Sequence, residues 1–197
     1  LTVRKHGLAG KNPIAEGNFQ WIFARNCEGT EQLRRYLYYQ LIHSMRKADR
    51  IDIIVSFLME SGVKMLLEEL KKAMKRGAKV RILTGNYLGI TQPSALYLIK
   101  HELGELVDLR FYNERNRSFH PKSYIFHYAD HSEIYIGSSN ISRSALTSGI
   151  EWNYRFSSHR DPEKYEKFYR TFEDLFQNHS VVIDDKELKR YSKTWHR

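Results

Sequence analysis

The chain has 197 residues, 41% of them hydrophobic, which is enough for one sizeable core and too few for two. A formal net charge of +9 makes polyanions the natural partners, whether nucleic acid or an anionic membrane face. A single cysteine excludes an internal disulfide framework, and no apolar run is long enough for a membrane span or a signal peptide. We therefore expect a cytoplasmic protein with no membrane partner.

The distribution of polar and apolar residues divides the chain into three parts. Residues 1–29 show no sustained period and are broken by glycines and a proline, so they predict an N-terminal arm or short edge elements. Residues 30–183 carry the periodic segments of one compact domain. Residues 184–197 turn highly polar and predict a C-terminal extension, which would serve as a linker if a further domain follows.

Helical and strand patterns alternate in the first half of this domain. Residues 30–48 carry an apolar stripe at three- and four-residue spacing and predict a helix. A β-branched run at 51–57 is typical of a buried strand, and a second helix (61–76) and a second strand (78–84) follow. A strand, a helix and a strand in about thirty residues predict a βαβ unit with parallel strands.

The second half continues with shorter elements. In order, they are a helix (94–103), a strand (107–112), two strands joined by a short turn (123–128 and 133–136), a strand (151–156) and a closing helix (162–176). The pattern predicts an α/β fold, a sandwich of helices around a mixed, largely parallel sheet.

Four side chains in this half are suited to phosphate chemistry. His120 and Lys122 stand two residues apart at the start of a predicted strand, so both leave the same face. Ser138 and Asn140, also two apart, follow directly after the next predicted strand. If these strands pair as a hairpin, an imidazole, an ammonium, a hydroxyl and an amide converge at one end of the sheet. Together they predict a phosphate site with a nucleophile.

Each group has a role in attack on a phosphodiester. Lys122 and Asn140 can neutralise and hydrogen-bond the non-bridging oxygens, and a neutral His120 imidazole can attack phosphorus. Glu151 could accept a hydrogen bond from the other ring nitrogen of His120 and fix its tautomer. Taken singly, each residue has an ordinary structural explanation, such as a turn or a solvated charge. Their joint order and spacing favour the functional interpretation.

A competing cluster, His127, Asp130 and His131, superficially resembles a set of metal ligands. His127 lies an odd number of residues from His120, so in an extended strand it should face the opposite way. The other two residues fit a polar turn between strands. We therefore predict no metal site and no cofactor.

The order His-x-Lys, Gly-Ser-x-Asn and Glu, at residues 120–122, 137–140 and 151, is similar to the His-x-Lys motif of the phospholipase D superfamily. Within that superfamily, the chain resembles the phospholipase-D-like domain at the N-terminus of some bacterial superfamily 2 helicases. The stretches that carry this second resemblance are TGNYLGIT (84–91), FHPK (119–122) and GSSNISRSAL (137–146).

The resemblance implies an α/β/α sandwich and a metal-independent reaction. Family members build one site from two copies of the motif, and this chain holds one copy, so the resemblance implies a homodimer with a shared active site. One His120 would form a phosphohistidine and the other would protonate the leaving oxygen. In the shared cleft, Ser138, Arg117 and Arg143 are expected to bind substrate. A fused helicase domain is the further expected partner.

One departure affects the choice between functions. The family motif usually has Asp five residues after the lysine, where this sequence has His127. The leading hypothesis is a phosphodiesterase of nuclease type acting on nucleic acid, with DNA as the expected substrate. The alternative, slightly favoured by His127, is a catalytically weak nucleic-acid-binding module of a helicase or DNA-processing protein. A lipid phosphodiesterase ranks third, because no membrane-targeting segment is present in the sequence.

Overall fold

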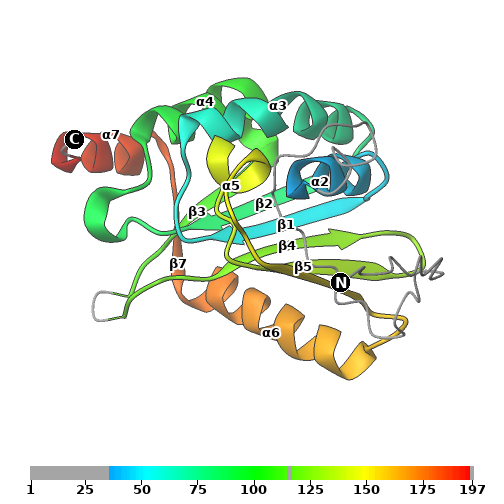
Figure 1. The fold of residues 1–197 in the computed structure, drawn as a ribbon. Helices are drawn as coiled ribbons and strands as arrows, with labels where there is room; N and C mark the ends of the chain where they lie inside the picture. The colour runs from blue at the N-terminus through cyan, green and yellow to red at the C-terminus, as the bar shows by residue number, and fades with distance from the viewer. Residues whose placement is uncertain (1–35, 115–116, 196–197) are drawn as a thin grey trace, which may run out of the picture.

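The computed structural model of the chain describes residues 36–114 and 117–195, which form one sheet with helices around it (Figure 1). The predicted arm at 1–29 and the start of the first predicted helix, 30–35, lie outside the described residues. The elements, in chain order, are α2 (Leu37–Met45), β1 (Arg50–Val55), α3 (Glu60–Lys75), β2 (Lys79–Thr84), a 3-10 turn (Tyr87–Gly89), α4 (Pro93–Leu103), a second 3-10 turn (Gly104–Leu106), β3 (Val107–Tyr112), β4 (Lys122–His127), β5 (Ser132–Gly137), α5 (Arg143–Thr147), β6 (Asn153–Ser157), α6 (Pro162–Asn178), β7 (Ser180–Val182) and α7 (Asp185–Thr194).

The described residues form a seven-stranded sheet in the order β6-β5-β4-β1-β2-β3-β7. The pairs β1–β2 and β2–β3 are parallel, which confirms the βαβ unit and the mixed α/β class. The other four pairs are antiparallel, so the expectation of a largely parallel sheet is wrong. A short connection explains one of these pairs: only residues 128–131 join β4 to β5, and so short a connection returns the chain antiparallel.

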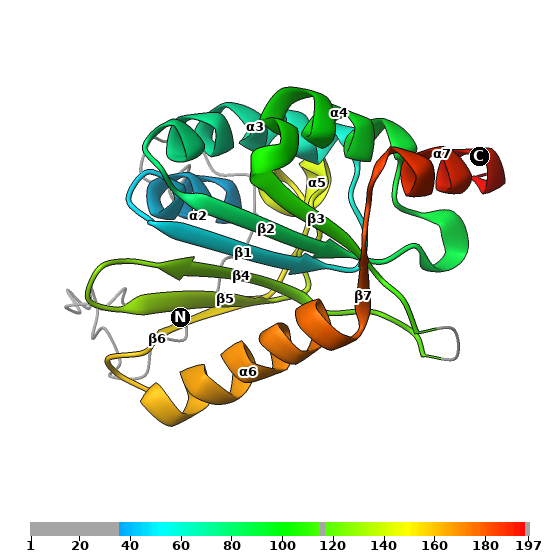
Figure 2. The ribbon, with the colours of Figure 1, turned by 180° about the vertical axis from the view of Figure 1, so that it is seen from behind.

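Helices cover both faces of the sheet, which makes the α/β/α sandwich (Figures 1 and 2). The face that carries α2, α3, α4 and α5 is buried in the larger apolar cluster, and α6 packs on the opposite face over the smaller one. Strand β1 serves both clusters, because Ile51, Ile53 and Val55 point into the larger and Ile54 into the smaller. Each such buried aliphatic side chain stabilises the fold by about 1.5–3 kcal/mol.

The C-terminal stretch expected as a polar extension contains helix α7. Asp184 caps it, with the side-chain Oδ1 accepting from Glu187 N at 2.7 Å. Tyr191 of α7 is buried in the larger cluster, and its hydroxyl donates to Thr91 O at 2.7 Å. The helix thereby holds the loop between β2 and α4. That a further domain follows it stays a prediction.

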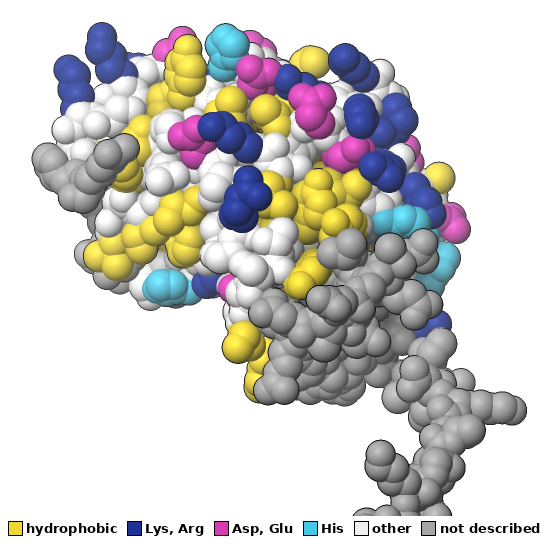
Figure 3. All heavy atoms as spheres, turned by 45° about the horizontal axis from the view of Figure 1, so that its top comes forward, with side chains coloured by type: hydrophobic (Ala, Val, Ile, Leu, Met, Phe, Trp, Pro, Cys, Tyr) yellow, Lys and Arg dark blue, Asp and Glu magenta, His cyan; other side chains and the backbone are white. Residues whose placement is uncertain are grey.

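The surface charge is distributed over the fold rather than gathered in one stripe. On the helix-covered face, Lys and Arg side chains are most dense at the right of the view, over the C-terminal ends of α2 and α3, with acidic side chains between them (Figure 3). None of the described helices combines the length and the apolar character needed to cross a membrane.

Candidate functional site

The fold brings the predicted site residues to one end of the central strands of the sheet. Strand β4 lies between β1 and β5, and Lys122 at its first position is opposite Val55, the last residue of β1. The predicted hairpin of β4 and β5 is confirmed, and Gly137 ends β5 opposite Asn153 of β6. The carboxyl ends of β1 and β5 therefore meet the amino ends of β4 and β6. His120 precedes this junction, and the segment 138–151 leaves from it.

The ammonium group of Lys122 has hydrogen-bond donors that the described residues do not use. One of its three donors goes to the backbone O of His120, at 2.7 Å from Nζ. Burial lowers the pKa of Lys122, and the negative charge of Glu151 acts in the opposite direction. The electrostatic influence of Glu151 on Lys122 places the two groups in one site. A half-buried ammonium with free donors is suited to a phosphate oxygen.

Asn140 is held so that its amide donor is available. The side chain is buried, with 6% exposed, and its Oδ1 accepts a hydrogen bond from the backbone N of Phe57 at 3.2 Å. Because the amide oxygen is used in this way, the Nδ2 group is left as the donor. Phe57 directly follows strand β1, so the position of this amide is set by the central strand of the sheet.

Ser138 contacts Glu151 and Trp152 instead of standing free for a ligand. Its hydroxyl donates to the Glu151 carboxylate and accepts from the backbone N of Trp152 at 3.0 Å, while its own N donates to Trp152 O at 2.9 Å. The single hydroxyl proton is thus committed to Glu151. Ser138 therefore holds the carboxylate, and that its hydroxyl also binds substrate stays a prediction. The predicted hydrogen bond between Glu151 and His120 is not formed.

His120 itself is exposed at the surface of this end of the sheet. Within the part of the chain that the structure describes, its ring makes no hydrogen bond. Arg117 and Arg143 are exposed as well, on the β3–β4 connection and at the first position of α5. Their guanidinium groups make no ion pair with a described residue.

Three buried residues that the sequence did not single out stabilise the turn after β5. The Tyr124 hydroxyl donates to Ser139 O at 3.0 Å, and Asn153 Nδ2 donates to Ser139 Oγ at 2.9 Å. Burial raises the pKa of Tyr124, and the nearby charge of Glu151 raises it further, so the hydroxyl keeps its proton. Strand alternation could have indicated Tyr124, because it lies two residues after Lys122 and shares its face.

Gly137 is required by the backbone of β6. A Cβ at this position would lie 1.9 Å from Trp152 O and 2.6 Å from the Asn153 side chain. Any larger residue would push the Glu151–Trp152 segment away from Ser138.

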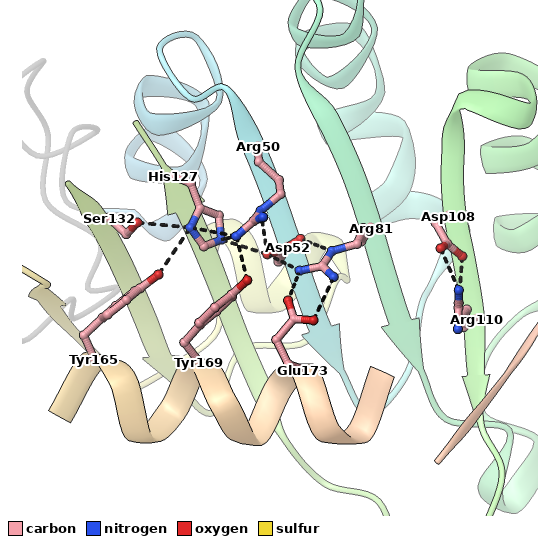
Figure 4. Close-up of polar contacts among 10 residues, drawn as sticks. All are labelled: Arg50, Asp52, Arg81, Asp108, Arg110, His127, Ser132, Tyr165, Tyr169 and Glu173. Carbon is pink, nitrogen blue, oxygen red and sulfur yellow. Dashed lines mark hydrogen bonds and ion pairs between the residues drawn. The ribbon is translucent and has the colours of Figure 1, made fainter. Parts of the chain in front are cut away.

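His127 lies on the other face of β4, as strand alternation predicts, in a buried charge network (Figure 4). Its Nε2 is 2.7 Å from Asp52 Oδ2, and its Nδ1 is 3.0 Å from Ser132 Oγ. Asp52 is fully buried and accepts from Arg81 Nε at 2.6 Å and Nη2 at 2.8 Å. Arg81 also pairs with Glu173 of α6, at 2.5 Å. The network therefore ties the helix to the sheet.

Burial alone would raise the pKa of Asp52, but hydrogen bonds from Arg81 and His127 outweigh it and the pKa is lowered. The competing metal cluster is not assembled, because His127 faces Asp52 while His131 pairs with Asp130 at 2.7 Å. In the described ranges, no three His, Cys, Asp or Glu side chains are arranged to hold a metal ion.

The comparisons with known proteins agree with this fold. The family model described as "Cardiolipin synthase, PLD-like domain" matches residues 39–179. The chain therefore belongs to this family of phospholipase-D-like domains, which confirms the superfamily resemblance and supports a hydrolase of phosphodiesterase type. The particular resemblance to a helicase N-terminal domain stays a prediction. No curated protein matches the chain.

Several solved structures are similar to the chain. Nuc from Salmonella typhimurium, described as a phospholipase D family member, is 21% identical over 75% of this chain and 90% of that one, with a TM-score of 0.54. NucT from Helicobacter pylori is 17% identical over 78% and 94%, with a TM-score of 0.57. Polyphosphate kinase from Porphyromonas gingivalis is 13% identical over 76% and 22%, with a TM-score of 0.55. At these identities the likenesses show the fold.

Proposed function

We propose that the chain is a metal-independent phosphodiesterase of nuclease type that acts on nucleic acid, with DNA as its substrate. The observation that carries the proposal is the junction of β4 and β5, where an exposed imidazole lies beside a lysine with free donors and an amide turned to donate. The groups belong to His120, Lys122 and Asn140. The net charge of +9 favours a polyanionic substrate. Family membership supports the class of reaction.

The proposed reaction has two displacements at phosphorus. First, a neutral ring nitrogen of His120 attacks phosphorus, and the bond from phosphorus to the leaving oxygen breaks. Lys122 and Asn140 bind the non-bridging oxygens as charge develops on them. The leaving oxygen takes a proton from a second imidazole. Water then attacks the phosphohistidine, gives its proton to that second imidazole, and releases free His120.

The second imidazole requires a second copy of the chain. One chain carries a single His-x-Lys motif, so we propose a two-fold homodimer in which each copy contributes one His120 to a shared cleft flanked by Arg117 and Arg143. At the working pH one imidazole is neutral and the other charged, and the two titrate as a pair. Sedimentation equilibrium checks this assembly, because an active species that stays monomeric during turnover would contradict it.

A second candidate is a nucleic-acid-binding module with little turnover, in a helicase or other DNA-processing protein. The observation that favours it is His127 at the position where the family motif has Asp. In this structure, however, His127 pairs with Asp52 on the opposite face of β4 from Lys122, so it does not take the place of a group that would bind phosphate. The proposal therefore keeps hydrolysis first. A helicase domain fused beyond residue 197 would suit either candidate.

Hydrolysis of bis(p-nitrophenyl) phosphate by the purified protein tests the proposal. His120→Ala should lower kcat on the order of a thousandfold or more, because it removes the attacking atom. His101→Ala, which removes an exposed histidine of α4, is the matched control and should keep the wild-type rate. Full activity of folded His120→Ala would refute the site.

The same assay with excess EDTA tests metal independence, and we expect the rate to persist. Loss of activity that one added divalent ion restores would refute the proposed mechanism. A protein that binds DNA but turns over neither DNA nor the chromogenic diester would support the binding module instead.

A further inference from the structure

A groove of about 730 Å³, lined mainly by residues with polar or charged side chains, lies beside the candidate site. The first turn of α3 and the residue before α4 form one wall, and the segment from 142 to 148 around α5 forms the other. Its polar lining includes Ser61, Lys64, Gln92, Ser142, Arg143 and Ser148. The volume is large enough for part of a polymer as well as a small ion.

Two chain segments lead from the candidate site into this groove. Residues 57–59 and 140–142 run side by side and are joined at a parallel bridge. At the site end, Phe57 N donates to Asn140 Oδ1, and one step further Met59 N donates to Ile141 O at 2.9 Å. The groove therefore begins within two residues of the amide proposed to bind the scissile phosphate.

Close packing fixes the walls of the groove. A Cβ at Gly62 would lie 2.5 Å from the carbonyl carbon of Ile141, so α3 rests directly on the backbone of the opposite wall. The backbone N of Arg143 donates to Ser61 Oγ at 3.4 Å across the same contact. The hydroxyl and cationic groups are thus carried on a rigid frame, which reduces the entropy lost when a ligand binds.

The chemistry of the lining suits a sugar–phosphate backbone. Serine hydroxyls, a glutamine amide, a lysine and an arginine are the side chains that commonly contact phosphate and sugar oxygens. None of the described lining residues is aromatic, and stacking on aromatic rings is how single-stranded bases are usually held. A lipid would need apolar surface for its chains, and Met59 is the only large apolar side chain in the lining. The groove therefore favours a nucleic acid over a phospholipid.

We propose that this groove is a second substrate subsite, which binds the backbone of the nucleic acid on one side of the scissile phosphate without reading its bases. The inference rests on the proposed function and extends it from one phosphate to a strand. The subsite adds affinity for a long substrate and makes no distinction of sequence.

The groove also contains one acidic residue, so removal of a negative and of a positive charge should change binding in opposite directions. Glu60 also lines it and pairs with Lys64 at 2.5 Å. Both side chains are substantially exposed, so their i,i+4 pair contributes only about 0.3–0.5 kcal/mol to stability and either can be replaced safely. Removal of the lysine charge should weaken binding of a polyanion, and removal of the glutamate charge should strengthen it.

The experiment compares Lys64→Gln, Glu60→Gln and Lys75→Gln, each in the His120→Ala background so that the strand is not cut. Lys75 is exposed at the opposite end of the same helix and gives the matched loss of one positive charge. Fluorescence anisotropy measures the dissociation constants of a thymidine dinucleotide and of an oligothymidylate of about twelve nucleotides.

We expect Lys64→Gln to weaken binding of the longer strand about fivefold and to reduce its salt dependence by about one ion, and Glu60→Gln to tighten it about threefold. The dinucleotide should change by less than about twofold, since it ends before the groove. Lys75→Gln should resemble the parent.

Three results would overturn the inference. In the first, Lys64→Gln and Glu60→Gln both resemble the parent while the longer strand still binds. In the second, Lys75→Gln weakens binding as much as Lys64→Gln, so that the general basic face is responsible. In the third, Lys64→Gln reduces binding to anionic phosphatidylglycerol vesicles and not to the longer strand. Failure of every variant and of the wild type to bind or cut any oligonucleotide would instead refute the proposed function, and the groove with it.

Discussion

Two polar clusters lie at opposite ends and on opposite faces of the same strand, β4. At its first residue, Lys122 belongs to the candidate site, and at its last, His127 belongs to the buried network around Asp52. In the network every charge has a partner: Asp52 is bound by His127 and Arg81, and also pairs with Arg50 Nε at 3.3 Å. In the site, Lys122 and Asn140 retain donors, and the His120 ring is exposed.

The difference distinguishes a cluster that holds the fold together from a cluster that can bind a substrate. A buried network in which each charge is paired inside the fold holds elements together, here β1, β2, β4 and α6. Polar groups that are fixed on one side and open on the other can bind a substrate without first breaking their own contacts. Judged by residue type alone, the Asp52 network with its histidine and carboxylates would be the better candidate for catalysis, but Asp52 is fully buried and paired inside the fold, which favours a structural role.

Removal of the central carboxylate of the network, Asp52, tests most directly whether the network is structural. Asp52→Asn should lower the free energy of unfolding by about 3–5 kcal/mol, because the buried guanidinium of Arg81 and its neighbours lose their counter-charge. Urea unfolding measures the loss. The rate per folded molecule on bis(p-nitrophenyl) phosphate should stay near the wild-type value, since the network does not contact the site.

Asp108→Asn is the matched control for this change. Asp108 also binds an arginine, accepting from Arg110 Nε at 2.8 Å and Nη2 at 2.9 Å, but its side chain is 38% exposed (Figure 4). Its loss should cost about 1 kcal/mol or less. Equal losses of unfolding free energy for Asp52→Asn and Asp108→Asn would mean that burial does not increase the contribution of the Asp52 network to stability.

Short-range patterns predicted most of the fold and a smaller part of the site. Apolar period and β-branched runs identified β1 to β6 and the helices α3, α4 and α6, because both sheet faces are buried and the signal is strong. The βαβ unit and the β4–β5 hairpin were right, but the sheet as a whole was wrongly expected to be largely parallel, since the other strand directions depend on where the chain crosses the sheet. The edge strand β7, with three residues, is too short to show a period.

Within the site, spacing predicted the convergence at the β4–β5 junction, because a two-residue repeat fixes which face a side chain leaves. It did not predict that the Glu151 carboxylate would accept a hydrogen bond from Ser138 instead of from the His120 ring. That choice depends on the backbone of Trp152, which approaches Ser138 through the pairing of β5 with β6. Asp52 and Arg81 were missed for the same reason: their partners come from a neighbouring strand and from α6, many residues away.

A smaller effect is expected in the candidate site, where the role of Ser138 can be tested. Ser138→Ala removes the hydroxyl that donates to Glu151, so the carboxylate near Lys122 loses its fixed position. We expect kcat on bis(p-nitrophenyl) phosphate to fall about tenfold, in line with one hydrogen bond to a charged group, and the free energy of unfolding to change by less than about 1 kcal/mol.

A double-mutant cycle separates positioning from direct binding by Ser138. If the hydroxyl acts through Glu151, then Ser138→Ala should add little to the loss already caused by Glu151→Gln. Additive losses would show that Ser138 contacts the substrate itself, as the sequence predicted. Ser192→Ala, which alters an exposed serine of α7, is the control and should leave kcat unchanged.

The smallest expected effect is in the pH dependence of stability, and it follows from the lowered pKa of Asp52. A carboxylate whose pKa is lower in the folded than in the unfolded chain contributes stability above its unfolded value, about 4, and loses it as the pH falls through the folded value. The wild type should therefore lose this contribution below about pH 4, whereas Asp52→Asn has none to lose. Glu69, whose pKa is also lowered, lies outside the network and acts equally in both proteins. Glu173 shares Arg81 with Asp52, and the Asp52 charge raises its pKa, so the pH dependence of Glu173 changes as well in Asp52→Asn. Urea unfolding of the two proteins across this range should show the gap between them narrowing as the pH falls. A constant gap would mean that Asp52 carries no charge in the folded protein, and the network would then be held by neutral hydrogen bonds instead of ion pairs.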